Sequence, residues 1–232
     1  MDSDTSMRDF FEPMIPLFYD NELIRNNHLK FHKANEQSQE RFTKIINLYI
    51  EEAELSYSLI SEKIDKKQEI LEVGGGIALT YVFLNLRNIK ITSIEPSDSG
   101  FDDYYSIGKE ICQICNMPTN NWISILGEDV DSLNKNFDII FSNNVLEHII
   151  NLRPTFIALE KVLKPGGVMV HNTVNYNVPY EPHFSIFLIP FFPRKTQLLY
   201  PKLKKESLWN GLNFINTRTI RKLCKELALN VK

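Results

Sequence analysis

The chain has 232 residues, which is enough for one domain or for one domain with an appendage. Hydrophobic residues make up 43% of it and aromatic residues 11%, which excludes a disordered chain, and the net charge of −3 gives no reason to expect a nucleic-acid partner. Three cysteines, no signal-peptide pattern at the N-terminus and no apolar run of about 18 residues predict a cytoplasmic protein without a transmembrane segment.

Residues 1–65 are predicted to form an N-terminal arm followed by a helix. In residues 1–36 the apolar side chains are interrupted by Pro13 and Pro16, so we expect an irregular arm that packs against the rest of the protein. In residues 42–64 apolar side chains recur every three or four positions, which predicts a helix.

Residues 66–174 alternate short apolar strands with helices. The predicted strands are Glu69–Val73, Ile89–Glu95, Trp122–Leu126, Phe137–Ser142 and Val168–Val174. The predicted helices between them are Leu79–Leu86, Tyr104–Cys115 and Pro154–Leu163. This order predicts an α/β, Rossmann-like fold with a mostly parallel sheet and flanking helices, which binds ligands beyond the carboxyl ends of its strands.

Residues 175–216, here called the insertion segment, interrupt this alternation, and residues 217–232 are predicted to return to the core with a last helix. The insertion segment is rich in proline and aromatic residues and is too long for an ordinary connection. It contains a basic stretch, Arg194–Lys205, beside an apolar one. Such a surface suits an anionic, phosphorylated or lipid-linked acceptor, or peripheral contact with a membrane.

A glycine-rich turn, Gly74, Gly75 and Gly76, follows the first predicted strand. Glycine lets the backbone approach a ligand closely, and the helix after the turn offers free N–H groups. The dinucleotide fingerprint G-x-G-x-x-G fails because position 79 is leucine, whereas G-x-G-x-G fails only because Ala78 is its third member. Glu72 would repel a pyrophosphate at this turn but would attract a positively charged amino acid.

The second predicted strand ends in Glu95, which lies 21 residues after Gly74. An acid at this spacing accepts hydrogen bonds from both hydroxyls of a ribose. Glu72, the glycines and Glu95 together resemble the cofactor site of the class I S-adenosylmethionine-dependent methyltransferases.

Three further stretches are similar to that family. Residues 126–129 resemble its acidic loop after the third strand, residues 137–148 its fourth strand and the following turn, and residues 163–168 the turn into its fifth strand. The resemblance covers about residues 66–174. It implies methyltransferase activity with S-adenosyl-L-methionine as the cofactor.

The resemblance also implies roles at the methionine end of the cofactor. Glu72 would hold the amino group, directly or through water, and Gly74 and Gly76 would line the carboxypropyl and ribose portion. Asn143 and Asn144 would border the methionine end.

At the nucleoside end, Glu95, which is followed by Pro96, would take the ribose hydroxyls. Glu128 or Asp129 would meet the adenine amino group, and both alternatives stay open. Ala78 replaces the usual glycine and narrows the loop by one methyl group.

Three side chains are candidates for catalysis. Glu147 and His148 follow the fourth strand and could supply a base, or part of a metal site as in some ubiquinone-pathway methyltransferases. The alternative is that they only start a helix and hydrogen-bond structurally. We predict no metal. His183 lies in the insertion segment, which corresponds to the substrate lid of the family. It is predicted to be a base or an acceptor-binding group, with a packed lid histidine as the alternative.

Residues 175–205 are expected to fold over the carboxyl ends of the strands, with Phe10–Tyr19 and the helix at 37–64 as the opposite wall. The basic stretch would then lie at the mouth of the site and favour an anionic acceptor. Six aromatic side chains are expected to be buried: Tyr176, Tyr180, Phe184, Phe187, Phe191 and Phe192.

The family's sheet usually ends with a sixth strand and an antiparallel seventh. Here Lys232 comes directly after the last predicted helix, so either this strand pair is missing or the chain is truncated. An uncovered edge strand would favour association with other chains.

The sequence therefore favours S-adenosylmethionine-dependent methyl transfer to O or N of a small metabolite or a sugar-containing precursor. The alternatives are a quinone or lipid methyltransferase and a non-catalytic cofactor-binding or partner-binding module. A nucleic-acid substrate is disfavoured because residues 142–145 read Ser-Asn-Asn-Val and lack the Pro-Pro-aromatic motif of base methylases.

Overall fold

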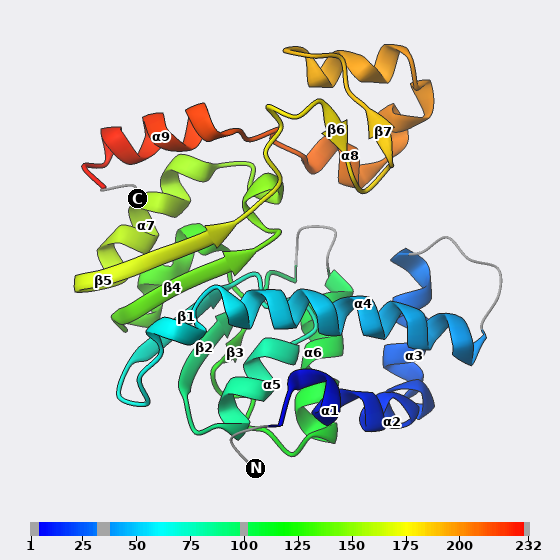
Figure 1. Ribbon diagram of the computed structural model, residues 1–232, viewed down its shortest axis with the longest axis vertical. Coiled ribbons are helices and arrows are strands. Elements are labelled where there is room, and N and C mark those ends of the chain that lie inside the picture. The colour runs from blue at the N-terminus through cyan, green and yellow to red at the C-terminus, as the bar shows by residue number, and fades with distance from the viewer. Residues whose placement is uncertain (1–4, 32–37, 98–101, 230–232) are drawn as a thin grey trace.

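The computed structural model describes residues 5–31, 38–97 and 102–229. Its centre is a five-stranded parallel sheet in the order β3-β2-β1-β4-β5, shown in Figure 1. The strands are β1 (Glu69–Val73), β2 (Lys90–Ile94), β3 (Trp122–Ile123), β4 (Phe137–Asn143) and β5 (Leu163–Asn172). The predicted α/β Rossmann-like fold is thus confirmed, with a five-stranded sheet in the described part of the chain.

Successive side chains of each strand point to opposite faces of the sheet. Both faces carry apolar side chains, and helices cover both. On β1, Ile70 joins the apolar cluster under α4 (Gln39–Ser58), α5 (Leu79–Leu86) and α6 (Asp102–Ile114). The next residue, Leu71, joins the cluster under α7 (Leu152–Val162) and the 3₁₀ helix η3 (Gly127–Leu133). A parallel strand that is buried on both sides reads as a continuous apolar run, as Ile139, Ile140 and Phe141 of β4 do.

Strand β1 marks the point where the strand order reverses, because β2 and β4 flank it and the chain winds outward in both directions. In open α/β sheets, ligands bind outside the carboxyl ends of the strands at such a point. These ends belong to β1, which leads into the glycine turn, and to β4, which leads into η4 (Leu146–His148).

The prediction of an irregular N-terminal arm is wrong, because residues 7–31 are helical. They form α1 (Met7–Phe11), η1 (Glu12–Met14), α2 (Ile15–Asp20) and α3 (Glu22–Phe31). Pro13 and Pro16 lie in the first turns of η1 and α2, where a missing N–H costs no helical hydrogen bond. The expected packing is confirmed, because five side chains of this region are buried in the core: Met7, Phe11, Ile15, Phe18 and Ile24.

The insertion segment builds a small core of its own. Its elements are the antiparallel pair β6 (Tyr180–Glu181) and β7 (Ile186–Phe187), the 3₁₀ helices η5 (Pro193–Leu198) and η6 (Pro201–Lys205), and α8 (Ser207–Gly211). Figure 1 shows this unit beyond the carboxyl ends of β4 and β5. The apolar side chains buried in it are Leu188, Leu203, Trp209, Leu212 and Phe214.

Asn213 of the insertion segment is hydrogen-bonded to η4 and to the residue after it. The side-chain amide of Asn213 donates to the carbonyl oxygens of Leu146 at 2.6 Å and Ile149 at 2.9 Å. Its backbone N–H donates to the Glu147 carbonyl at 2.9 Å. These three bonds fix η4 against the insertion segment.

The expectation that all six aromatic side chains of this segment are buried is wrong for three of them. Phe187, Phe191 and Phe192 are 76%, 93% and 55% exposed, whereas Tyr176, Tyr180 and Phe184 are half-buried. The reason is that other apolar side chains already fill the small core: Leu188, Leu203, Trp209, Leu212 and Phe214.

The chain returns to the sheet with α9 (Thr217–Glu226), which packs beside α7 through Leu223 and Cys224. Strand β5 is an edge of the sheet, and its side chains are only half-buried or exposed. Within the described ranges, no helix is long and apolar enough to cross a membrane.

Candidate active site

The glycine turn is held tightly against β2 and β3. Gly74 has a φ of +73°, and its N–H donates to the Ile94 carbonyl at 2.9 Å. A Cβ on Gly75 would collide with Ser93 Oγ and with the ring of Trp122. At Gly76, by contrast, where φ is +57°, a Cβ would meet no atom within 4 Å. The turn therefore has a crowded inner side and an open outer side.

Two buried carboxyl groups flank this turn. Glu72, at the end of β1, is 4% exposed and accepts a hydrogen bond from Ser93 Oγ at 2.6 Å. Glu95, directly after β2, is 5% exposed and accepts from the Gly76 N–H at 2.8 Å. Burial raises the pKa of Glu72 to about 7 and that of Glu95 to about 8.

Neither carboxyl group forms an ion pair within the described ranges of the chain. Burying two neighbouring carboxylates without a cation costs free energy, unless a ligand supplies the missing charge and hydrogen bonds. The pair is therefore suited to a ligand that brings one positive charge and several hydroxyl donors.

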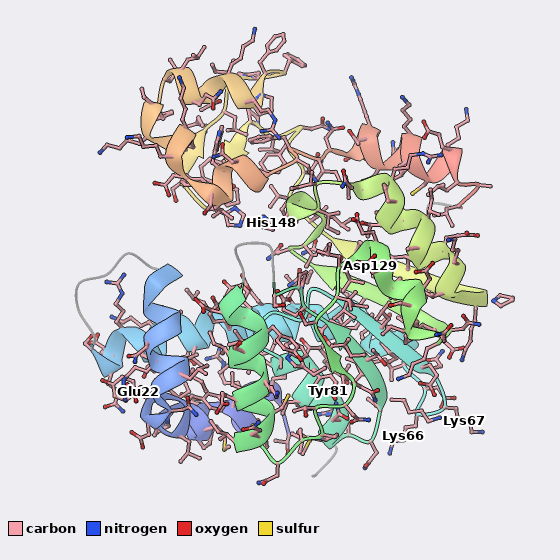
Figure 2. All side chains as sticks on the ribbon, turned by 180° about the vertical axis from the view of Figure 1, so that it is seen from behind. Glu22, Lys66, Lys67, Tyr81, Asp129 and His148 are labelled. Carbon is pink, nitrogen blue, oxygen red and sulfur yellow. The ribbon has the colours of Figure 1, made fainter. Side chains whose placement is uncertain are left out.

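The remaining predicted cofactor residues lie along the same edge of the sheet. Pro96 follows Glu95 beyond the end of β2, and Ala78 is the N-cap of α5, in the left-handed conformation with a φ of +69°. Glu128 is half-buried and Asp129 exposed, both in the first turn of η3. Figure 2 shows Asp129 at the edge of the sheet that also carries His148.

Asn143, the last residue of β4, and Asn144, which follows it, connect β4 with α4 and β5. Asn143 Nδ2 donates to the Glu52 carbonyl of α4 at 3.1 Å, and Asn143 Oδ1 accepts from Asn172 of β5 at 2.7 Å. Asn144 takes a φ of +54°, and its N–H donates to the Asn172 carbonyl at 3.0 Å. These bonds hold the end of β4 against α4 and β5. Phe10–Tyr19 do not reach the predicted site, because α1 and α2 pack on the side of α4 away from the insertion segment (Figure 1).

The three predicted catalytic residues come together between the sheet and the insertion segment. The rings of His148 and His183 meet edge to face, with their centroids 5.2 Å apart. Figure 2 shows His148 on the side of η4 that faces the insertion segment. Glu147 is fully buried, and its Oε2 accepts from Thr173 Oγ1 at 2.7 Å.

His183 is paired with a carboxylate that the sequence analysis did not assign. Its Nδ1 lies 2.6 Å from Glu181 Oε1, and Glu181 is fully buried. The same carboxylate accepts from the Tyr176 hydroxyl at 3.2 Å and from the Phe184 N–H at 2.8 Å. The hydrogen bond to Glu181 raises the pKa of His183, and the charges of Glu181 and Glu147 raise it further.

Burial shifts the other two groups toward their neutral forms. It lowers the pKa of His148 to about 4, to which the positive charge of His183 also contributes, and it raises the pKa of Glu147. Glu147 Oε1 is buried and makes no hydrogen bond to any described residue. That oxygen is available to a donor group on a ligand.

Glu52 on α4, a second acid that is not among the predicted site residues, also interacts electrostatically with His183. Glu52 is exposed, so solvent screens this contribution. Glu181 had a local signal, since residues two apart on an extended chain share a face and the sequence reads Glu-Pro-His. Glu52 had no local sequence signal, because its position near His183 depends on how α4 packs against the sheet. Among the described residues, no group of three metal-ligating side chains is gathered in a metal site.

The basic stretch Arg194–Lys205 does not flank His183. It forms the part of the insertion segment farthest from the sheet, coloured orange in Figure 1. Its position therefore gives no support to an anionic acceptor.

The family model described as "Methyltransferase domain" matches residues 29–231. An uncharacterised protein of Mycobacterium tuberculosis (strain ATCC 25618 / H37Rv) is 31% identical over 174 residues, which are 70% of this chain and 58% of that protein. A ubiquinone biosynthesis O-methyltransferase of Rickettsia bellii (strain OSU 85-389) is 27% identical over 130 residues, 56% of this chain and 50% of that enzyme. The chain thus spans about half the length of these relatives.

The fold is similar to that of the plantazolicin methyltransferase BamL, solved in complex with a triazolic desmethylPZN analogue and SAH. The two align with a TM-score of 0.53 and 16% identity over 94% of this chain and 76% of the other.

Proposed function

We propose that this chain, which belongs to the class I S-adenosylmethionine-dependent methyltransferases, transfers a methyl group to a hydroxyl oxygen of a small molecule. The observation that carries the choice of a hydroxyl is the short contact between His183 and the buried Glu181. The relatives from Rickettsia, which are named O-methyltransferases, are consistent with it.

The residues at the glycine turn fit this cofactor. Glu72 is buried, without a cationic partner in the described part of the chain, and suits the α-amino group. Glu95 suits the ribose hydroxyls, and the open side of Gly76 leaves room for a ligand against the backbone. Glu128 or Asp129 would hold the adenine amino group, while Asn143 and Asn144 would border the methionine end.

When bound, S-adenosylmethionine supplies an electrophilic methyl group on its sulfonium. The protein then has to orient the acceptor, exclude water and remove one proton. His183 would accept the hydroxyl proton on Nε2, because Nδ1 is engaged by Glu181. Glu181 holds the ring in one orientation and stabilises the imidazolium that forms.

Glu147 and His148 would shape the acceptor side of the site. His148, with its low pKa, stays neutral at pH 7 and adds no charge beside the sulfonium. The free Oε1 of Glu147 would orient a donor on the acceptor.

The acceptor itself can be found by screening a small-molecule library for release of S-adenosylhomocysteine. Wild-type binding of this cofactor without any acceptor in a broad screen would favour a non-catalytic module.

We expect Glu95→Ala to weaken binding of S-adenosylhomocysteine by about 1–3 kcal/mol, the value of hydrogen bonds to a charged group. Isothermal titration calorimetry measures this loss. Glu69→Ala is the matched control, because Glu69 lies at the amino end of β1, where it pairs with Lys90 on the surface. Wild-type affinity in Glu95→Ala, or a preference for NAD, would contradict the assignment.

Cofactor affinity should rise with pH between about 6 and 8. In the free protein the raised pKa values keep Glu72 and Glu95 largely protonated below pH 7, whereas the ammonium and ribose groups favour the carboxylates. Binding therefore releases protons, and Glu72 alone accounts for an affinity change of about tenfold across this range. Calorimetry in buffers of different ionisation enthalpy counts the protons. Proton uptake, or none exchanged at pH 6.5, would be the opposite result.

A further inference from the structure

Exposed apolar side chains are concentrated on the insertion segment. Fourteen large apolar side chains are strongly exposed in the described part of the chain, and seven of them lie between residues 178 and 200. The other seven are scattered over the N-terminal helices, the sheet and its turns, which is ordinary for a soluble surface. Six of the seven are grouped at β7, η5 and the turn into η6: Phe187, Phe191, Phe192, Leu198, Leu199 and Tyr200.

The same segment is strongly basic. Between residues 182 and 205 the sequence has five Lys or Arg residues and no Asp or Glu, although the whole chain has a net charge of −3. Arg194 is used internally, because its guanidinium donates to the Leu212 carbonyl at 2.8 Å and lies over the Phe214 ring. Four lysines, all exposed, remain on the surface: Lys195, Lys202, Lys204 and Lys205.

The apolar and basic side chains come from one stretch of the chain, here called the apolar–basic patch (residues 187–205). The helices η5 and η6, which carry Leu198 and all four lysines, contact each other. Lys195 Nζ lies 4.4 Å from the centroid of the Phe192 ring. Phe191 takes a φ of +64°, an unfavourable conformation for a bulky residue, and is 93% exposed. Such strain persists where the surrounding structure fixes it, often at binding sites.

We propose that the apolar–basic patch binds the surface of an anionic lipid bilayer. Phenylalanine, leucine and tyrosine enter the boundary between headgroups and acyl chains, while lysines beside them pair with anionic headgroups. The orange part of the patch, which contains η5 and η6, lies at the end of the insertion segment that projects farthest from the sheet, so it can meet a flat surface without hindrance from the core (Figure 1).

The charge argues against two other occupants. A second copy of this chain would bring an equally basic patch against this one, and the like charges would repel. A nucleic acid would use the lysines but would leave exposed leucines such as Leu198 and Leu199 in water. An anionic bilayer, in contrast, satisfies both kinds of side chain.

The experiment is co-sedimentation of the full chain with vesicles of phosphatidylcholine alone or with about 30 mol% phosphatidylglycerol. We expect binding to the anionic vesicles only, and less of it when NaCl rises from about 0.05 M to about 0.5 M. The double variant Phe191→Ser/Phe192→Ser and the triple variant Lys202→Gln/Lys204→Gln/Lys205→Gln should each bind at least tenfold more weakly.

Two control variants change similar side chains elsewhere. Lys66→Gln/Lys67→Gln removes two exposed lysines at the opposite end of the molecule (Figure 2), and Ile150→Ser removes an apolar side chain that is 78% exposed outside the patch. Both should bind like the wild type. Circular dichroism and S-adenosylhomocysteine binding verify that every variant is folded.

Three outcomes would overturn the proposal. The first is equal binding to neutral and anionic vesicles, or to neither. The second is wild-type vesicle binding by the folded patch variants. The third is a dimer, seen by light scattering without vesicles, that Phe191→Ser/Phe192→Ser abolishes, since this would assign the patch to a second copy.

Discussion

Replacing His183 with asparagine should lower methyl transfer by about 10²–10⁴-fold, the contribution of a positioned general base. Asparagine can still donate to Glu181, which lies 2.6 Å from His183 Nδ1, so the insertion segment should keep its structure. It cannot accept the hydroxyl proton, however. The measurement is kcat with the acceptor that the library screen identifies, together with the affinity for S-adenosylhomocysteine, which should stay unchanged.

Glu181→Gln tests the pairing itself. Because Glu181 raises the pKa of His183, its removal should lower that pKa and shift the acidic limb of the pH–rate profile to lower pH. The carboxylates of Glu147 and Glu52 remain and keep part of the shift, while the neutral His148 contributes no charge at pH 7. NMR titration of the His183 ring follows the same change without any acceptor.

If His183→Asn keeps more than about a third of the wild-type rate, the histidine only packs in the insertion segment.

The cofactor half of the site could be predicted from the sequence because its signals are local. Glu72, the glycines and Glu95 stand at fixed distances from strand ends, and the carboxyl ends of neighbouring parallel strands meet at one edge. Strand β1 and helix α5 coincide with their predicted bounds. Strand β3 is only Trp122–Ile123, shorter than predicted, because a sheet edge pairs only as far as its neighbour extends.

The other half depends on tertiary contacts that no spacing encodes. The bond between Asn143 and the Glu52 carbonyl, 91 residues apart in sequence, exists because α4 crosses the end of β4. The N-terminal helices were missed for a different reason. Proline usually breaks a helix, but Pro13 and Pro16 occupy first-turn positions that tolerate it.

Glu72→Gln should weaken S-adenosylhomocysteine binding by about 2–4 kcal/mol at pH 8, roughly 30- to 1,000-fold. Removing one partner of a buried charge pair leaves the ammonium of the ligand desolvated and uncompensated. The glutamine side chain has nearly the same shape as glutamate, and its amide oxygen can still accept the hydrogen bond that Ser93 donates to Glu72 at 2.6 Å. Calorimetry at pH 8 is appropriate because the wild-type carboxyl, with a pKa of about 7, is then mostly ionised.

A ligand without the amino acid separates this effect from general damage. 5′-Methylthioadenosine has the ribose and adenine but no ammonium, so Glu72→Gln should bind it as the wild type does. Glu95→Ala, in contrast, should weaken both ligands, because both present ribose hydroxyls. Equal losses for the two ligands in Glu72→Gln would mean that the variant disturbs the turn between β1 and α5. Undiminished binding of S-adenosylhomocysteine would mean that Glu72 does not meet the ammonium, and the raised pKa of Glu72 would then reflect burial alone.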